Sequence, residues 1–143
     1  MKIKQISVFL ENRAGRLAKV TQVLKEGNVN IRALSIADTS DFGILRMIVD
    51  HTDKAYEILK ANDFTVSSTD VIAVAIEDKP GGLGKILAVL NNVGINLEYV
   101  YAFLGKSGQK AVMICRVERP DDAIKALQKA NIQVLDMLTL DHI

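Results

Sequence analysis

The apolar and polar residues of the chain follow the same succession of patterns twice. Near the start, Ile6, Val8 and Leu10 alternate with residues of the opposite face, which predicts a strand over 5–11. Leu17 and Leu24 then recur at helical spacing. The patterns that follow predict a strand, a strand, a helix and a strand: residues 30–38, 44–50, 52–61 and 64–68.

The second half of the chain repeats the first in register. "NRAGRLAKVTQVLKEGNVNI" from Asn12 aligns with "DKPGGLGKILAVLNNVGINL" from Asp78, so that Gly15 corresponds to Gly81. Further on, the offset grows by two residues, which we assign to a hairpin at "LGKSGQK" (104–110). Two copies of so long a unit are too few for a solenoid, and they favour duplicated domains over residues 1–68 and 69–143.

Each copy has the order β-α-β-β-α-β. Two crossovers of this kind predict an α+β fold in which an antiparallel sheet carries both helices on one face, the ferredoxin-like arrangement. The fold alone does not define a function. RNA-binding versions stack bases on aromatic residues of the central strands. The corresponding strands here, "ILRMIVD" and "AVMICRV", contain none.

Composition narrows the choice of function. The 143 residues include 18 Lys and Arg against 17 Asp and Glu, so the net charge of +1 gives no general attraction to nucleic acid or anionic lipid. The single cysteine, Cys115, excludes an internal disulfide and paired-cysteine metal carriage. No run of about 20 apolar residues is present. We therefore expect a soluble cytoplasmic protein without nucleic-acid or membrane partners, metal or cofactor.

The glycine turn before the first helix of each copy suggests a ligand. Gly15 and Gly81-Gly82 allow a ligand to approach the backbone, and the helix N-terminus that follows favours a carboxylate. Asn12 and Asp78 offer oxygens to an ammonium group. Together these groups suit a free amino acid. The alternative is that the turns are only turns, with Asn12 and Asp78 capping their helices.

The two phrases resemble the signature of the ACT domain: Asp or Asn, Pro-Gly, Leu, a helix, and a closing Gly-apolar-Asn-apolar. The first phrase departs from it, with Ala14 in place of proline. The resemblance covers nearly the whole chain as two tandem domains. It implies a regulatory module that binds an amino acid or a similar metabolite where two domains meet, using the first strand–helix loop of one domain and the second strand of its neighbour.

The resemblance, with the flanking charges and the second strands, defines the expected ligand-binding residues. They are Asn12, Arg13, Ala14, Gly15, Arg16, Leu17, Asn30, Ser35, Asp78, Lys79, Pro80, Gly81, Gly82, Leu83, Asn96 and Tyr101. Arg13, Arg16 and Lys79 could hold a carboxylate, although such residues are more often solvated. The charge of Asp78 and the stiffness of Pro80 favour a stronger site on the second loop.

An apolar stripe distinguishes the second copy. Tyr99, Tyr101 and Phe103 share one face of the expected second strand, where the first copy has small residues. We assign this face to the side of the sheet away from the helices. Such a face is seldom left in water, so we expect it to form an interface, within the chain or in a homodimer. A sharper alternative is that a tyrosine lines the ligand site.

The sequence thus predicts a regulatory, allosteric sensor without catalytic residues. It would bind a free amino acid between ACT domains and signal through domain pairing to a separate enzyme or regulator. Two alternatives remain: a small enzyme on a ferredoxin-like scaffold, for which we find no convergent acid–base set, and a purely structural oligomerisation module.

Overall fold

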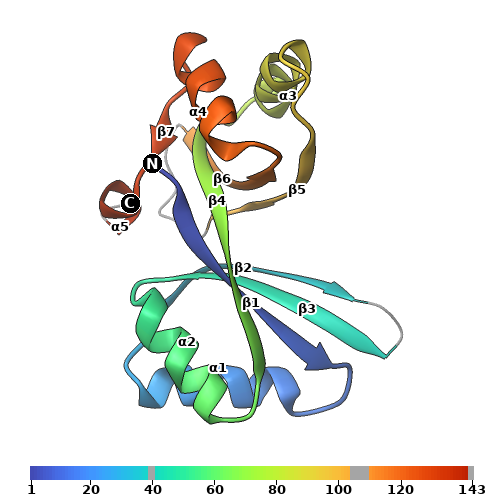
Figure 1. Ribbon diagram of the computed structural model, residues 1–143, viewed down its shortest axis with the longest axis vertical. Coiled ribbons are helices and arrows are strands. Elements are labelled where there is room, and N and C mark those ends of the chain that lie inside the picture. Colours follow the sequence, from blue (N-terminus) through green and yellow to red (C-terminus); the bar gives the residue numbers. More distant parts are fainter. Residues whose placement is uncertain (39–40, 104–109, 142–143) are drawn as a thin grey trace. The chain divides into compact units, whose positions relative to one another are not determined.

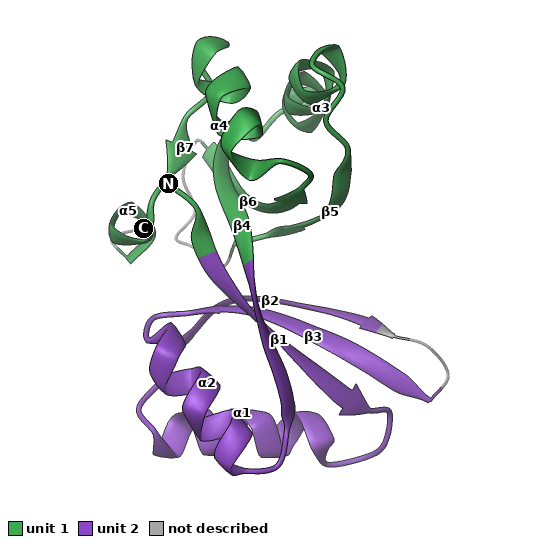
Figure 2. Cartoon of the chain, viewed as in Figure 1, with its two compact units in different colours: residues 1–3, 70–143 green, residues 4–69 purple. Residues whose placement is uncertain are grey.

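A computed structural model describes residues 1–38, 41–103 and 110–141 (Figure 1). The hairpin expected at 104–110 lies, apart from Lys110, outside the described residues. The chain forms two compact units (Figure 2). The 4–69 unit holds the first copy of the repeat. The second copy, 70–143, forms the other unit together with residues 1–3, and we call it the 70–143 unit.

The 4–69 unit is built from the elements that the first copy predicts. They are β1 (Ile3–Glu11), α1 (Arg16–Glu26), β2 (Ile31–Asp38), β3 (Phe42–Val49), α2 (Thr52–Ala61) and the first part of β4 (Thr65–Glu77). Its strand order is β2-β3-β1-β4, with β3 antiparallel to both β1 and β2. Helices α1 and α2 pack against each other and cover one face of the strands, where Ile6, Leu24, Leu45 and Leu59 are among the buried core residues.

The 70–143 unit repeats this design. After β4 it contains α3 (Gly82–Asn92), β5 (Leu97–Ala102), β6 (Lys110–Val117), α4 (Pro120–Lys129), β7 (Val134–Leu135) and α5 (Met137–Asp141). Strand order is β7-β4-β6-β5, antiparallel throughout. Its core again lies between the sheet and two helices, with Ile72, Leu90, Cys115 and Leu127 among its members. The predicted tandem ferredoxin-like α+β fold is confirmed.

The strand that ends the first copy and the strand that begins the second are one continuous strand, β4. The boundary expected between residues 68 and 69 lies inside it. The stretch 64–79 contains neither glycine nor proline and is rich in β-branched residues, so nothing in it stops an extended backbone.

All four long helices end in the same way. The second residue after each helix has a positive φ: Asn28, Asp63, Gly94 and Asn131. After α1, the N–H of Val29 donates to the Leu24 carbonyl oxygen at 2.9 Å, and equivalent bonds follow the other three helices. The residue that donates is apolar and buried each time: Val29, Phe64, Ile95 and Ile132. The turn therefore stops the helix and returns the chain to the core.

The C-terminal helix α5 was not expected from the sequence. It follows the two-residue strand β7 and begins after Asp136, whose Oδ1 accepts a hydrogen bond from the Thr139 N–H at 2.8 Å. The hydrogen bonds from Thr139 lower the pKa of the Asp136 carboxyl below its ordinary 3.8. Leu140 is fully buried, so this short helix contributes to the packing.

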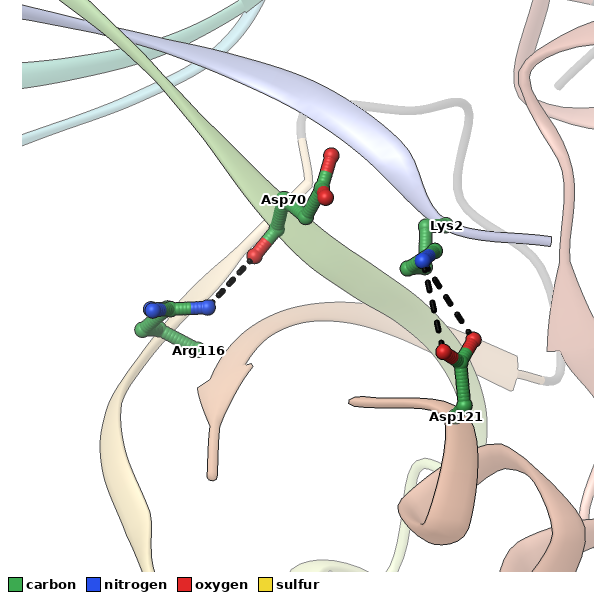
Figure 3. Close-up of polar contacts among 4 residues, drawn as sticks. All are labelled: Lys2, Asp70, Arg116 and Asp121. Carbon is green, nitrogen blue, oxygen red and sulfur yellow. Dashed lines mark hydrogen bonds and ion pairs between the residues drawn. The ribbon is translucent and has the colours of Figure 1, made fainter. Parts of the chain in front are cut away.

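Polar contacts within the 70–143 unit hold its N-terminal residues and its first strand (Figure 3). Lys2 Nζ lies 3.4 Å from the Asp121 carboxylate at the start of α4, which ties residues 1–3 to this unit. Arg116 of β6 donates to the Asp70 carbonyl oxygen at 3.0 Å. It also pairs through Nε with Glu98 of β5 at 3.1 Å. Arg116 therefore joins three neighbouring strands of one sheet.

Candidate functional site

The two strand–helix loops have the same backbone. Gly15 and Gly81 precede their helices with φ of 88° and 87°, values that favour glycine. Two residues into the loop, the N–H of Arg13 donates to the Glu11 carbonyl oxygen at 2.9 Å, and the N–H of Lys79 donates to that of Glu77 at the same distance. No side chain caps either helix. The glycines are therefore needed for backbone conformation.

The side chains of each loop form the same exposed ion pair. Arg13 Nε lies 3.0 Å from Glu11 Oε2, and Lys79 Nζ lies 2.6 Å from Glu77 Oε2. The hydrogen bond with Lys79, followed by its charge, lowers the pKa of Glu77 below its ordinary 4.5, and the same contact raises the pKa of Lys79. Both basic residues thus have an acidic neighbour already.

A cavity of about 160 Å³ lies beside the first loop, within the 4–69 unit. Four of the predicted ligand-binding residues line it: Asn12, Arg13, Arg16 and Leu17. Four residues that sequence reasoning missed complete the lining: Leu10, Glu11, Ile36 and Gly43. The first loop therefore brings a cation, polar groups and apolar walls together.

Sheet register explains how the cavity arises. Gly43 of β3 lies opposite Leu10 of β1 and opposite the end of β2. Gly43, Leu45 and Met47 are spaced two residues apart along β3, so they lie on the same face of the sheet. Leu45 and Met47 face the helices. Gly43 therefore belongs to the helix-covered face and has no side chain to fill the space there. Ile36 of β2 projects from the same face. The strand pairing would have been needed to find these residues from the sequence.

Arg16 is the cation of this cavity without an acidic neighbour. Its guanidinium carbon lies 4.7 Å from the centroid of the buried Phe64 ring, and its Nε is buried without a hydrogen-bond acceptor. Stacking on an aromatic ring holds such a group in place. A desolvated donor without an acceptor is costly. Because this Nε is closed to solvent, a ligand oxygen would approach the guanidinium through its other two nitrogens.

The second loop lines a different and smaller cavity. This cavity has a volume of about 70 Å³, and Gly82 is one of its lining residues. Asp78, Lys79 and Leu83 do not line it. Gly82 occupies the position of Arg16, and a Cβ there would collide with the Glu77 carbonyl oxygen. The second copy therefore has a close backbone contact where the first has its unpaired guanidinium.

The remaining predicted residues lie elsewhere. Ala14 and Pro80 lie in the two turns and are exposed. Asn30 and Asn96 follow the far ends of α1 and α3, where their carbonyl oxygens accept from the N–H groups of Asp50 and Glu118 at 3.1 Å. Ser35 pairs with Arg46 on the outward face of its sheet.

The aromatic stripe of the second copy is largely buried. Tyr101 and Phe103 are each 8% exposed, and Ile114, which pairs with Tyr101, is fully buried. Tyr101 thus lies among packed side chains and lines neither loop cavity.

Two other kinds of site can be assessed over the described residues. In that part of the chain, no group of three or more His, Cys, Asp or Glu side chains is placed to hold a metal ion. None of the described helices combines the length and the apolar character that a membrane span requires.

Comparison with known families identifies the chain. The family model described as an ACT domain pair matches residues 1–142. This chain belongs to the ACT family. The ACT resemblance predicted from the two loop phrases is confirmed, and it extends over both copies.

Solved structures share the fold of this chain. Protein BT0572 from Bacteroides thetaiotaomicron is 42% identical, with a TM-score of 0.92, over 98% of this chain and 96% of that one. The regulatory subunits of aspartate kinase from Thermus thermophilus, in a ligand-free form, and from Thermus flavus are 19% and 18% identical. Both have a TM-score of 0.64 and cover 89% of this chain and 91% of theirs. No protein of curated function matches the chain.

Proposed function

We propose that this ACT pair is a regulatory sensor that binds a free amino acid and passes its occupancy to a separate protein. The observation that carries the proposal is the cavity beside the first loop. It combines the unpaired guanidinium of Arg16 with the carboxylate of Glu11 and the polar Asn12. A free amino acid presents one carboxylate and one ammonium group, and this lining offers a partner to each.

The route of the signal in this proposal is the edge of the sheet. Strand β2 pairs only with β3 in the described part of the 4–69 unit, so its other edge is open to a second strand. Leu34 and Ile36 of this strand are 42% and 44% exposed. Because Ile36 also lines the cavity, a bound ligand would change the surface next to the edge. We therefore include in the proposal a cytoplasmic homodimer whose pairing responds to the ligand.

The comparisons support the same kind of role. The fold of this chain is also that of subunits named as regulatory in Thermus. A module of this fold that acts on a separate enzyme is therefore a reasonable precedent. The two alternatives are a small enzyme and a purely structural module. The structural module differs from the sensor in a measurable way, because it would bind no metabolite.

A thermal-shift screen against the twenty common amino acids tests the sensor. A ligand present at one hundred times its dissociation constant should stabilise the folded chain by about 2.7 kcal/mol. Titration calorimetry should then show saturable heat for the same amino acid. If no amino acid shifts the melting temperature or gives heat, the amino-acid sensor is wrong.

Light scattering tests the dimer. We expect a dimer at micromolar concentration, and we expect Leu34→Lys on the exposed edge to give a monomer, since a charge on an edge strand opposes pairing. The wild-type chain running as a monomer both with and without the binding amino acid would remove domain pairing from the proposal.

A further inference from the structure

The charge around the first-loop cavity is uneven. Arg13 is compensated by Glu11 at 3.0 Å, whereas no carboxylate among the described residues pairs with Arg16. Arg16 is held by the Phe64 ring rather than by an acid. The cavity therefore has one position at which an incoming carboxylate meets an uncompensated cation. Charge-assisted hydrogen bonds to such a group are among the strong ones.

Apart from the three charged residues and Asn12, the walls of the cavity are apolar and partly open to solvent. Leu17 is 40% exposed and Ile36 is 44% exposed, and both line the cavity with the buried Leu10. A charged ligand side chain that lies against Leu17 and Ile36 would lose water there without gaining a partner. An apolar one would remove surface of Leu17 and Ile36 from water. Since roughly 150 Å³ is enough for a benzene-sized guest, a cavity of about 160 Å³ has room for a branched aliphatic side chain.

We infer that the first loop selects an α-amino acid with an apolar side chain, binding its carboxylate through Arg16, and that the chain has one such site. This inference rests on the proposed function and adds the ligand class and the copy that binds it. The ammonium group would face Glu11, which keeps a second carboxylate oxygen beside the one that accepts from Arg13.

The second copy lacks the features that carry the inference. Arg16 is replaced by Gly82, where a side chain would strike the Glu77 carbonyl oxygen. Ile36 corresponds to Ala102 and Gly43 to Ala111, so one wall is lost and the space over the strand is reduced. Asp78, whose negative charge favoured the second loop in the sequence, does not line the smaller cavity there, and the two lysines that do, Lys85 and Lys110, both act on Glu77.

Calorimetry on the full-length chain with four probes tests the ligand class. Leucine should bind with one site per chain. Leucinamide keeps the side chain and the ammonium but has no carboxylate, so it should bind at least tenfold more weakly, since a hydrogen bond to a charged group is worth about 1.5–3 kcal/mol. Aspartate and lysine, which place a charge against Leu17 and Ile36, should bind more weakly still.

Matched variants locate the site. Arg16→Met keeps most of the apolar stem and should weaken leucine binding by about tenfold to a hundredfold. Arg16→Lys restores the charge and should recover part of the loss, whereas Lys19→Met removes a charge from the same helix outside the cavity and should have no effect. Ile36→Ala should weaken binding by roughly tenfold. Its control, Leu87→Ala, alters a similarly exposed apolar residue on α3 that does not line the cavity.

The outcomes separate the two levels of the proposal. If no amino acid binds at all, the sensor and the ligand class are both overturned. If an amino acid binds but is charged, or if leucine binding survives Arg16→Met and Ile36→Ala, the sensor stands and the inference is wrong. Loss of binding in Asp78→Ala with full binding in Arg16→Met would move the site to the second loop. If Arg16→Met does not fold, leucinamide and Ile36→Ala still decide.

Discussion

The two strand–helix loops of this chain share a backbone and differ in chemistry. Gly15 and Gly81 have nearly the same φ, and an acid–base pair precedes each of them. The first residue of the helix differs: Arg16 in one copy and Gly82 in the other. The duplicated turn thus acts as a scaffold, and the single position after it carries a guanidinium in the first copy and makes a close backbone contact in the second.

The comparison also shows that the match to a motif does not predict which residues line the cavity beside a loop. Asp78 and Pro80 make the second phrase the better match to the ACT signature, and the charge of Asp78 favours an ammonium. The lining of the first-loop cavity, however, depends on Leu10, Ile36 and Gly43, which lie outside the phrase. The match of a loop to its family and the lining of the cavity beside it are separate properties.

The largest expected effect concerns the glycine that replaces Arg16. In Gly82→Ala the new Cβ would collide with the Glu77 carbonyl oxygen, and we expect a loss of roughly 1–3 kcal/mol in the free energy of unfolding, as for overpacking. Gly84→Ala is the matched control two residues along α3. A Cβ there meets nothing within 4 Å, so we expect a gain of about 0.5–1 kcal/mol. Urea unfolding of both variants measures the difference, and equal stabilities would contradict the close contact.

A smaller and symmetrical effect is expected at the two turn glycines. Gly15→Ala and Gly81→Ala should each cost about 1–2 kcal/mol, because alanine is strained in the left-handed region. A Cβ at either position meets nothing within 4 Å, so the cost comes from φ alone. Denaturant midpoints should therefore fall by similar amounts in the two variants. Clearly unequal losses would show that the loops are not the same scaffold.

The smallest expected effect is the pH response of the exposed pair Glu77–Lys79. The pKa of Glu77 is lower in the folded chain than its ordinary 4.5. Its contribution to stability is therefore present above pH 4.5 and is lost as the pH falls through the lowered pKa. That of Lys79, whose pKa is raised above 10.5, is present below that pH and is lost as the pH rises through the raised value.

An NMR titration of the Glu77 carboxyl measures this. Lys79→Met should move its midpoint up towards 4.5, and 1 M salt should act in the same direction by screening the charges. A midpoint that does not change in the variant would mean that Lys79 is not the partner in solution.

Much of the fold followed from the sequence, and the departures have physical reasons. The internal repeat predicted the element order, because apolar spacing recurs in both copies. The continuity of β4 was missed since the two copies were treated as separate, although no residue in 64–79 breaks a strand. Helix α5 was missed because five residues carry too little periodicity, and Asp136 as its cap was the available signal.

The candidate site was only partly predictable. The loop residues could be identified from the glycine turn, since φ is a local property. The rest of the cavity depends on which residues β1, β2 and β3 place side by side. This pairing register depends on all three strands and cannot be predicted from one of them alone. The different environments of Arg16 and Gly82 could not be seen in an alignment of the two phrases, because they depend on Phe64 and on the Glu77 carbonyl oxygen.

Cys115, a core residue of the 70–143 unit, can report on the opening of that unit. It is fully buried, and desolvation raises the pKa of its thiol to about 12. Since the thiolate is the reactive form, an alkylating reagent modifies Cys115 only when the 70–143 unit opens. The chain has no other thiol. The alkylation rate of the intact protein therefore measures the opening of the second copy alone. A change in that rate when a ligand binds the first copy would measure the coupling free energy between the two domains.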